Sequence, residues 1–206
     1  MSGKYAQQIS THYDAIAPLW DEEQKDSSYG IESLMLAMSM CGEYTVRRTA
    51  LDIGCGSGGR MIKAMEQHAF QVTGIDCSAS MLEIAHHRHP ASMFIHADII
   101  TWNTSEHYDL ILAWDSLFHL PYEEQEHVLL KLISLLKHDG IMLFTFGDDI
   151  GEHISEWHDR PFYYSSLGVE KNMEILQGND CRIRHLELDQ YPLKHCVCIA
   201  KKGRIQ

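Results

Sequence analysis

The sequence predicts an α/β fold in which a mostly parallel sheet carries helices on both faces. Short β-branched, apolar runs alternate with longer amphipathic runs from residue 49 to residue 146, which is the pattern of successive β-α-β units. Several short runs are apolar at nearly every position, as in strands covered on both sides. The length of 206 residues fits one domain of this class.

Five apolar runs are expected to form the sheet: 49–53, 71–75, 92–96, 108–114 and 141–146. Runs with helical spacing separate them: 57–67, 78–88 and 122–136. Ser78 is placed to cap the second of these helices, and Gly140 is expected to end the third. Each helix is therefore expected to be a crossover connection.

The last part of the chain differs from this pattern. Residues 182–190 and 195–201 alternate in polarity and are joined by four residues, which predicts an antiparallel hairpin at the edge of the sheet. Before it, residues 148–167 are expected to form a long polar and aromatic connection. A connection of this length either binds a ligand or covers the edge of the sheet with its aromatic side chains.

Composition narrows the classes of partner. The chain has 29 acidic and 17 basic residues, a net charge of −12, and such a surface repels phosphate backbones and anionic lipid headgroups. We therefore expect no nucleic-acid or membrane partner. No apolar run approaches the ~18 residues of a membrane span. The six cysteines form no CxxC pair, which favours reduced thiols and a cytoplasmic protein.

Fourteen histidines are many for this length. His86, His87 and His89 are close together, but no Cys or carboxylate partner stands at ligand spacing, so we expect a solvated helix face and no metal site.

The chemistry concentrates where the first strand turns into a helix, at residues 51–59. Gly54, Gly56 and Gly59 satisfy the GxGxxG pattern, which leaves a dinucleotide cofactor as one alternative. Asp52 argues against it, because a carboxylate just before the glycines would oppose a pyrophosphate. The same carboxylate can pair with an ammonium group.

Two more carboxylates end the next two strands. Asp76 is placed to accept hydrogen bonds from ribose hydroxyls, and its alternative role is a strand-end cap. Asp98 is placed to accept from the exocyclic amine of an adenine. Three carboxylates at one sheet edge thus indicate a ligand with an amine, a diol and an adenine.

These motifs resemble the class I S-adenosylmethionine-dependent methyltransferases over roughly residues 45–147. The resemblance is carried by Asp52-Ile53-Gly54-Cys55-Gly56-Ser57-Gly58, Gly74-Ile75-Asp76-Cys77-Ser78, His96-Ala97-Asp98-Ile99 and Tyr108-Asp109-Leu110-Ile111. The final hairpin is similar to that of poorly characterised bacterial members.

The resemblance implies a Rossmann-like sheet of seven strands whose last strand is antiparallel, with S-adenosylmethionine bound across the strand ends. The glycines would line the methionine part, Asp76 the ribose, and Asp98 with Ile99 the adenine. Met81 would flank the ring, or it simply packs in the core. The complete set of expected cofactor residues is Asp52, Gly54, Cys55, Gly56, Gly58, Asp76, Cys77, Met81, Asp98, Ile99 and Trp114.

Methyl transfer from a sulfonium is an in-line displacement, so alignment supplies much of the rate and a base is optional. His119, just beyond the fourth strand, is the candidate proton acceptor, or else it only bonds the backbone. The residues expected to contact the acceptor are Tyr13, Trp20, Asp115 and Tyr163.

The acceptor is expected to be a small molecule. Residues 115–118 lack the Asn/Asp-Pro-Pro-aromatic run of amino-methyltransferases that act on bases, and no Pro-Cys pair offers the nucleophile of cytosine methylation. The methylated atom and the oligomeric state stay open. So do two other functions: a module that binds the cofactor without turnover, and a dinucleotide-dependent oxidoreductase.

We expect residues 1–206 to form a single methyltransferase domain with four parts. These are a helical lid segment at 1–45, the cofactor-binding core at 46–147, a substrate-side connection at 148–167, and a terminal helix and β-hairpin at 168–206.

Overall fold

The structure is a computed structural model that describes residues 2–42 and 47–203, and the expected boundary between residues 45 and 46 lies outside the described residues. Its elements in chain order are α1 (Ser2–Gln24), α2 (Ile31–Met40), β1 (Arg48–Ile53), α3 (Gly59–Gln67), β2 (Phe70–Asp76), α4 (Ala79–Arg88), β3 (Met93–His96), β4 (Tyr108–Ala113), the 3-10 turn η1 (Leu117–His119), α5 (Tyr122–Leu135), β5 (Leu136–Gly147), β6 (Ile150–Trp157), β7 (Arg160–Leu167), α6 (Gly168–Gly178), β8 (Cys181–Asp189) and β9 (His195–Lys202).

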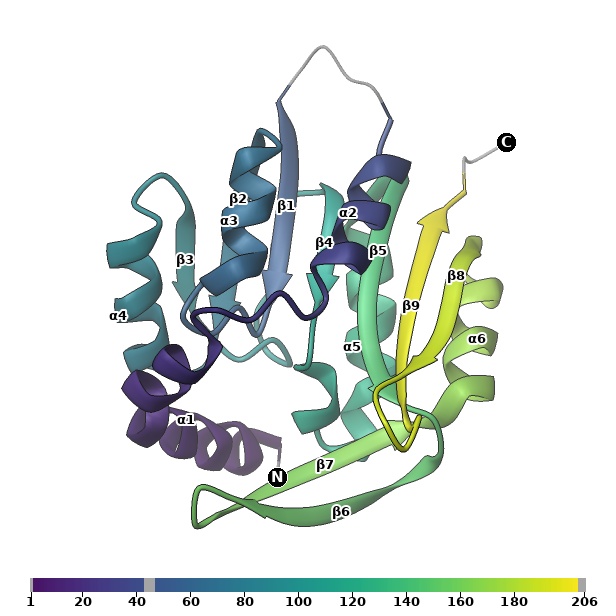
Figure 1. Ribbon diagram of the computed structural model, residues 1–206. Helices are drawn as coiled ribbons and strands as arrows, with labels where there is room; N and C mark the ends of the chain where they lie inside the picture. Colours follow the sequence, from purple (N-terminus) through teal and green to yellow (C-terminus); the bar gives the residue numbers. More distant parts are fainter. Residues whose placement is uncertain (1, 43–46, 204–206) are drawn as a thin grey trace.

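The main sheet has seven strands in the order β3-β2-β1-β4-β5-β9-β8 (Figure 1). Strands β1 to β5 pair in parallel, and β9 runs antiparallel to both of its neighbours. The predicted fold class, the five apolar strands and the terminal hairpin are confirmed. From β1 the sheet extends through β2 and β3 in one direction and through β4 and β5 in the other. Ligands bind at such a switch point in open α/β sheets.

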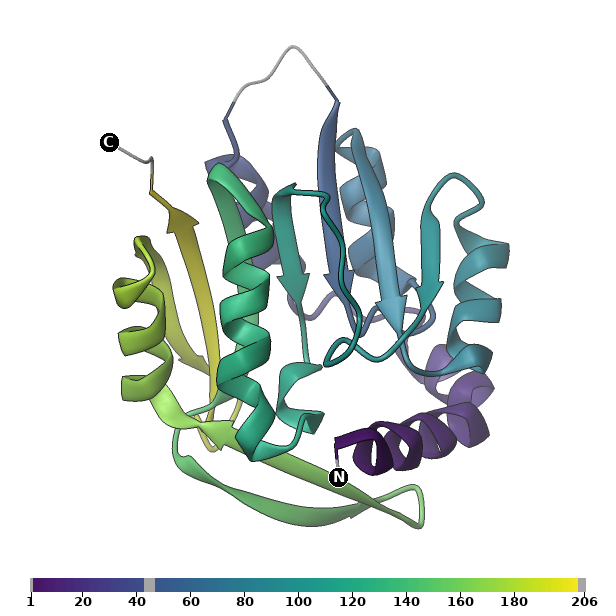
Figure 2. The same ribbon diagram turned by 180° about the vertical axis from the view of Figure 1, so that it is seen from behind.

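Helices cover both faces of the sheet because successive strand residues point to opposite sides. Leu51 and Ile111 face the core under α5, whereas Leu110 and Leu112 face α2 and α3 on the other side. Figure 1 shows α2 and α3 in front of the sheet. Figure 2, the view from behind, shows α5 and α6 in front of it. Within the described part of 1–45, α2 therefore packs on the sheet and only α1 has the place of a lid.

The expectation that Gly140 ends a helix is wrong. Helix α5 ends at Leu135 and β5 begins at the next residue, so Gly140 lies inside a strand. A Cβ atom at Gly140 would lie 2.8 Å from the carbonyl oxygen of Lys137 and 3.1 Å from that of Tyr108. Glycine is needed there because the pairing of β5 with β4 shifts register and the backbones approach closely.

The expected connection at 148–167 is instead a second, two-stranded sheet of β6 and β7. The two strands are joined by His158 and Asp159, whose φ values of 49° and 57° are left-handed. A two-residue turn of this kind usually contains Gly or Asn, and the absence of those residues hid the hairpin from sequence reasoning. Figure 1 shows β6–β7 and α1 together below the carboxyl ends of the parallel strands.

Among the described residues, no helix combines the length and the apolar character needed to cross a membrane.

Candidate active site

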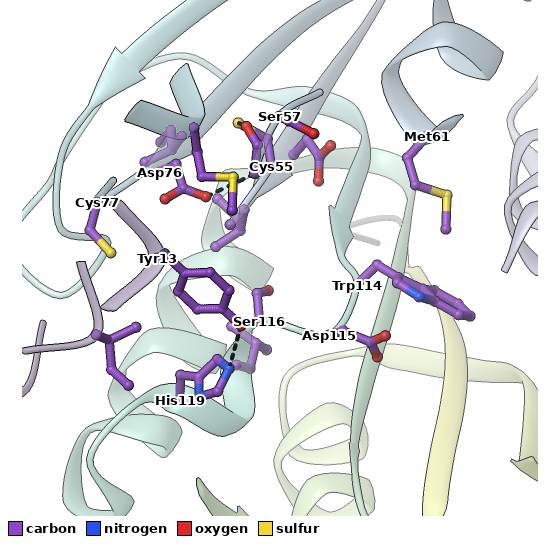
Figure 3. A pocket seen from close by; sticks show the side chains of 18 of the residues that line it. Tyr13, Cys55, Ser57, Met61, Asp76, Cys77, Trp114, Asp115, Ser116 and His119 are labelled. Carbon is purple, nitrogen blue, oxygen red and sulfur yellow. Dashed lines mark hydrogen bonds between the residues drawn. The ribbon is translucent and has the colours of Figure 1, made fainter. Parts of the chain in front are cut away.

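A pocket of about 460 Å³ opens at the carboxyl ends of β1 to β4. This volume is in the ~300–1,000 Å³ range of small-ligand sites. It is lined by the strand ends and the loops that follow them, and by side chains of α1, β6 and β7. Figure 3 shows Tyr13 of α1 among the side chains of the strand-end loops. The carboxyl ends of the strands thus face α1 and the β6–β7 hairpin across the pocket.

The loop after β1 forms one wall, and glycine is required in it. Gly54, Gly56 and Gly58 have φ values of 68°, 53° and 78°, which side chains rarely adopt. A Cβ atom at Gly54 would lie 2.4 Å from the Cβ of Ser116, whereas one at Gly56 would meet only the Nε1 of Trp20, 3.8 Å away. The loop backbone at Gly56 is therefore exposed to a ligand in the pocket.

The three predicted carboxylates lie along this edge of the sheet. Asp76 accepts hydrogen bonds from the backbone N–H of Gly56 and of Ser78, both at 2.8 Å, and therefore has the capping role given as its alternative. Its oxygens keep lone pairs that can accept further hydrogen bonds. Asp98 accepts from the backbone N–H of Ile100 at 2.9 Å and lines the pocket.

Asp52 is different, because it is 4% exposed and has no hydrogen-bond partner among the described residues. Burial, and then the negative charge of Asp76, raise the pKa of Asp52 to about 7. A buried carboxylate that makes no hydrogen bond is costly, so this group indicates a ligand with a positive charge or strong hydrogen-bond donors.

Four buried side-chain polar atoms lack hydrogen-bond partners in the described part of the chain, and two of them belong to residues of the pocket: the Nε1 of Trp114 and the Oγ of Ser116. Both residues line the pocket at the end of β4. Buried polar atoms are normally hydrogen-bonded, so these two indicate polar ligand groups near the glycine loop.

His119 lies at the other side of the pocket, bonded at both ring nitrogens. Its Nδ1 lies 2.9 Å from the carbonyl oxygen of Tyr163, so Nδ1 carries the proton and Nε2 accepts from the hydroxyl of Tyr13 at 3.0 Å (Figure 3). Burial lowers the pKa of His119 to about 4, and burial raises that of Tyr13. The pair is therefore neutral at neutral pH, with the basic nitrogen facing α1.

Asp115 is held in a network that sequence reasoning did not identify. The Nε2 of His195 lies 2.9 Å from the Oδ1 of Asp115, and the Nδ1 of His195 contacts Asp189. The two carboxylates face both ring nitrogens and raise the pKa of His195 against the effect of burial, which favours the imidazolium form. The hydroxyl of Tyr29 donates to Asp189 at 2.8 Å. Residues so distant in the chain gave no local signal.

Arg60 was also missed, although it follows the glycine motif directly. Its Nε donates to the carbonyl of Tyr29 at 2.6 Å, and its guanidinium interacts with the charges of Asp52 and Asp115. It is the one lysine or arginine among the residues that line the pocket. An arginine one residue after the last glycine was the available signal.

The structure brings nearly all predicted site residues to this one pocket: Tyr13, Trp20, Asp52, Gly54, Cys55, Gly56, Gly58, Asp76, Cys77, Met81, Asp98, Ile99, Trp114, Asp115 and His119. Tyr163 is the exception, because its hydroxyl bonds Glu152 and the backbone N–H of Tyr122 outside the pocket. Neighbouring strand residues point to opposite faces, and Tyr164 lines the pocket instead.

No group of three or more His, Cys, Asp or Glu side chains within residues 2–42 and 47–203 is arranged to hold a metal ion. His86 and His87 are exposed, and His89 is buried against Glu66 at 2.8 Å.

Residues 50–140 match the family model of a methyltransferase domain. This chain contains a methyltransferase domain. Its sequence is 33% identical over 106 residues to trans-aconitate 2-methyltransferase of Rhizobium etli, covering 51% of this chain and 41% of that protein. It is 37% identical over 101 residues to the enzyme of the same name from Escherichia coli, covering 48% and 38%. The match thus spans about two fifths of the length of these relatives.

Solved structures show the same fold around the methyltransferase domain. The 1,6-didemethyltoxoflavin-N1-methyltransferase of Burkholderia thailandensis has a TM-score of 0.76 at 16% identity, covering 99% of this chain and 91% of that one. The magnesium protoporphyrin IX methyltransferase of Synechocystis has a TM-score of 0.69 at 17% identity, covering 97% of each chain. The resemblance to the class I methyltransferases is confirmed in fold, and the family model matches residues 50–140 of this chain.

Proposed function

We propose that this protein transfers a methyl group from S-adenosylmethionine to a small-molecule acceptor. The observation that carries the proposal is Asp52, a buried carboxylate that makes no hydrogen bond with the described residues and lies beside a glycine loop open to a ligand. The names of the relatives and the titles of the structural neighbours, several of them complexes with this cofactor or its demethylated product, support it.

The pocket residues fit the parts of the cofactor. Asp52 and Arg60 are a complementary pair for the ammonium and carboxylate of its methionine part. Asp76 would accept from the ribose hydroxyls, and Asp98 from the adenine amine. When bound, the cofactor supplies an electrophilic methyl group on a sulfonium. The chain itself contributes the alignment of the methyl group with its acceptor.

Residues outside the matched segment 50–140 complete the pocket. Tyr13 and Trp20 come from α1, Trp157 from β6 and Tyr164 from β7, and all four line the cavity. We therefore propose that residues 1–206 act as one domain in which α1 covers the site. His119 is proposed as the proton acceptor for acceptors that need one, with the proton passing through the Tyr13 hydroxyl.

We also propose that the protein is cytoplasmic and has no nucleic-acid partner. All six cysteines are unpaired, which supports the cytoplasm, and the net charge of −12 argues against a nucleic-acid partner. An oxidoreductase using a dinucleotide is less well supported, because Asp52 would oppose a pyrophosphate.

Cofactor binding is tested on Asp52→Asn. The side chain makes no hydrogen bond within the described structure, so the variant should unfold at the same or a higher temperature than the wild type. Affinity for S-adenosylhomocysteine, measured by calorimetry at pH 8, should fall about 10- to 100-fold, as expected for one charge-assisted hydrogen bond. The exposed Asp149→Asn is the matched control and should bind normally.

Thermal shift adds the cofactor comparison. S-adenosylmethionine should raise the melting temperature, since a ligand of the native state stabilises it, and NAD should not. An equal shift with NAD would refute the cofactor assignment. Transfer of a labelled methyl group into a metabolite mixture then separates an enzyme from a module that only binds the cofactor.

A further inference from the structure

The charges of the pocket divide into two sets. Asp52 lies near the end of β1, Asp76 ends β2 and Asp98 follows β3, where the proposed function places the cofactor, and Arg60 is assigned to the same ligand. Asp115 follows β4 beside Trp114 (Figure 3) and lines the same pocket as Tyr13 and His119, whose pKa values its charge raises. Among the charged residues that line the pocket, Asp115 is the one that the proposed function does not assign to the cofactor; its Oδ1 is paired with His195.

Hydrogen bonds to its backbone and to one carboxylate oxygen fix the position of Asp115. Its backbone has a left-handed φ of 50°, and its N–H donates to the Oγ1 of Thr145 at 2.8 Å. Oδ1 accepts from Thr145 at 3.2 Å and from the Nε2 of His195 at 2.9 Å. Oδ2 has no hydrogen-bond partner among the described residues. The strained backbone and the bonds to one oxygen fix the carboxylate and leave the other oxygen free to accept.

The walls on this side are aromatic and uncharged. Phe118 and Tyr164 stand beside His119, with ring centroids 4.8 and 4.9 Å from it, and burial keeps the imidazole neutral. Tyr13, Trp20 and Trp157 pack edge to face or tilted against one another across the cover of the pocket. Aromatic faces attract cations, and a single carboxylate among them favours a donor of positive or neutral charge.

We propose that the methyl acceptor is a nitrogen base, a primary or secondary amine on an apolar or aromatic frame, whose N–H donates to Oδ2 of Asp115. This inference rests on the proposed function. It departs from the relatives' name, because a tricarboxylate would place three negative charges in a pocket that already holds four carboxylates and one arginine.

Methyl transfer from the sulfonium to a neutral amine needs no further reagent. The lone pair of the neutral amine forms the new carbon–nitrogen bond while the carbon–sulfur bond breaks, leaving its electron pair on sulfur. The ammonium so formed releases one proton to water. Asp115 contributes the orientation of the lone pair, because it holds the N–H on the other side of the nitrogen.

The test compares amines with carboxylates of the same frame. Binding of tryptamine against indole-3-propionate, of phenethylamine against 3-phenylpropionate, and of trans-aconitate is measured by calorimetry on protein saturated with S-adenosylhomocysteine. We expect at least one amine to bind about tenfold or more tighter than its carboxylate partner. Asp115→Asn should reduce that preference to about threefold or less, and the exposed Asp149→Asn should keep it.

Carboxylates that bind as well as the amines, amines that all fail to bind, or a preference that survives Asp115→Asn would each overturn the inference. The wild-type comparison stands even if Asp115→Asn folds poorly. Titration with S-adenosylhomocysteine alone separates the two proposals: failure there refutes the proposed function, whereas normal cofactor binding with a carboxylate preference refutes only the acceptor class.

Discussion

At the scale of single residues, environment decides the chemistry of the two histidines beside the pocket. His119 has a carbonyl and a phenol as hydrogen-bond partners, and burial favours its neutral form. His195 has two carboxylates, which favour its charged form. The same side chain is therefore an available base in one place and a fixed cation in the other.

The lowered pKa of His119 makes stability depend on pH. Below its ordinary pKa of about 6.5, the unfolded chain takes up a proton that the native His119 does not, so stability falls as pH drops towards about 4. His119→Asn keeps a donor for the carbonyl of Tyr163 and should lose less stability than the wild type over this range. We expect a difference on the order of 2 kcal/mol in urea unfolding at pH 7 and pH 4.5.

The control for this measurement is His107→Asn, which removes an exposed imidazole outside the pocket. Parallel pH profiles for the wild type and His119→Asn would contradict the assignment of a neutral, buried His119. Turnover adds a second result: with an acceptor that needs a base, His119→Asn should lower kcat by ~10²–10⁴-fold and change cofactor affinity little.

At the scale of elements, side chains of α1 form hydrogen bonds with both ends of α4. Oδ1 of Asp14 accepts from the Oγ of Ser78 at 2.6 Å and from the backbone N–H of Ser80 at 2.9 Å. Arg88, at the other end of α4, bonds Asp21 through two N–H groups at 2.6 and 2.7 Å. One residue of α1 thus helps to cap another helix, where a carboxylate is favoured by the helix dipole.

Asp14→Ala should therefore loosen α1 without unfolding the sheet. We expect a loss of about 1–2 kcal/mol in the stability of this contact, seen as faster hydrogen exchange in α1 than in β1 or β4. Affinity for S-adenosylhomocysteine should fall as well, because Tyr13 and Trp20 line the pocket from α1. Asp26→Ala, just beyond the helix, is the control. Unchanged exchange in α1 would show that these bonds do not hold the helix.

At the scale of the whole molecule, the His195 network joins the terminal hairpin to the pocket. His195 begins β9, Asp189 ends β8, Asp115 follows β4, and Tyr29 precedes α2. Its contribution is charge-dependent. Because the native pKa of His195 is raised, the stability it contributes is complete below the unfolded value of about 6.5 and is lost as pH rises through the native value.

His195→Gln tests this coupling between distant parts. The variant should be less stable than the wild type by about 1–3 kcal/mol at pH 6, and the difference should shrink as pH rises. A double-mutant cycle with Asp115→Asn should show coupling of the two side chains. Equal losses at pH 6 and pH 9 would mean that the imidazole is not charged in the native protein.

Much of the architecture was predictable because it depends on local periodicity. The apolar runs of β1, β2 and β4 identify strands covered on both faces, and parallel strands bring Asp52, Asp76 and Asp98 to one edge. The capping role of Ser78 is local too, and its side chain accepts from the N–H of Met81 as expected. The turn in β6–β7 was not predicted because His158 and Asp159 are not the residues typical of such a turn, and the role of Gly140 was misassigned because glycine is also typical of a helix end.

The sequence by itself therefore determined the class of fold, the order of the parallel strands' carboxylates and the side of the pocket proposed for the cofactor. Only the tertiary structure decided the side proposed for the acceptor. There the proton of His119 is placed by a carbonyl on β7, and the carboxylate of Asp115 by a histidine 80 positions away. These contacts join residues that are far apart in the sequence and share no local pattern. The geometry of the contacts and the protonation of the two histidines are therefore set only once the chain has folded.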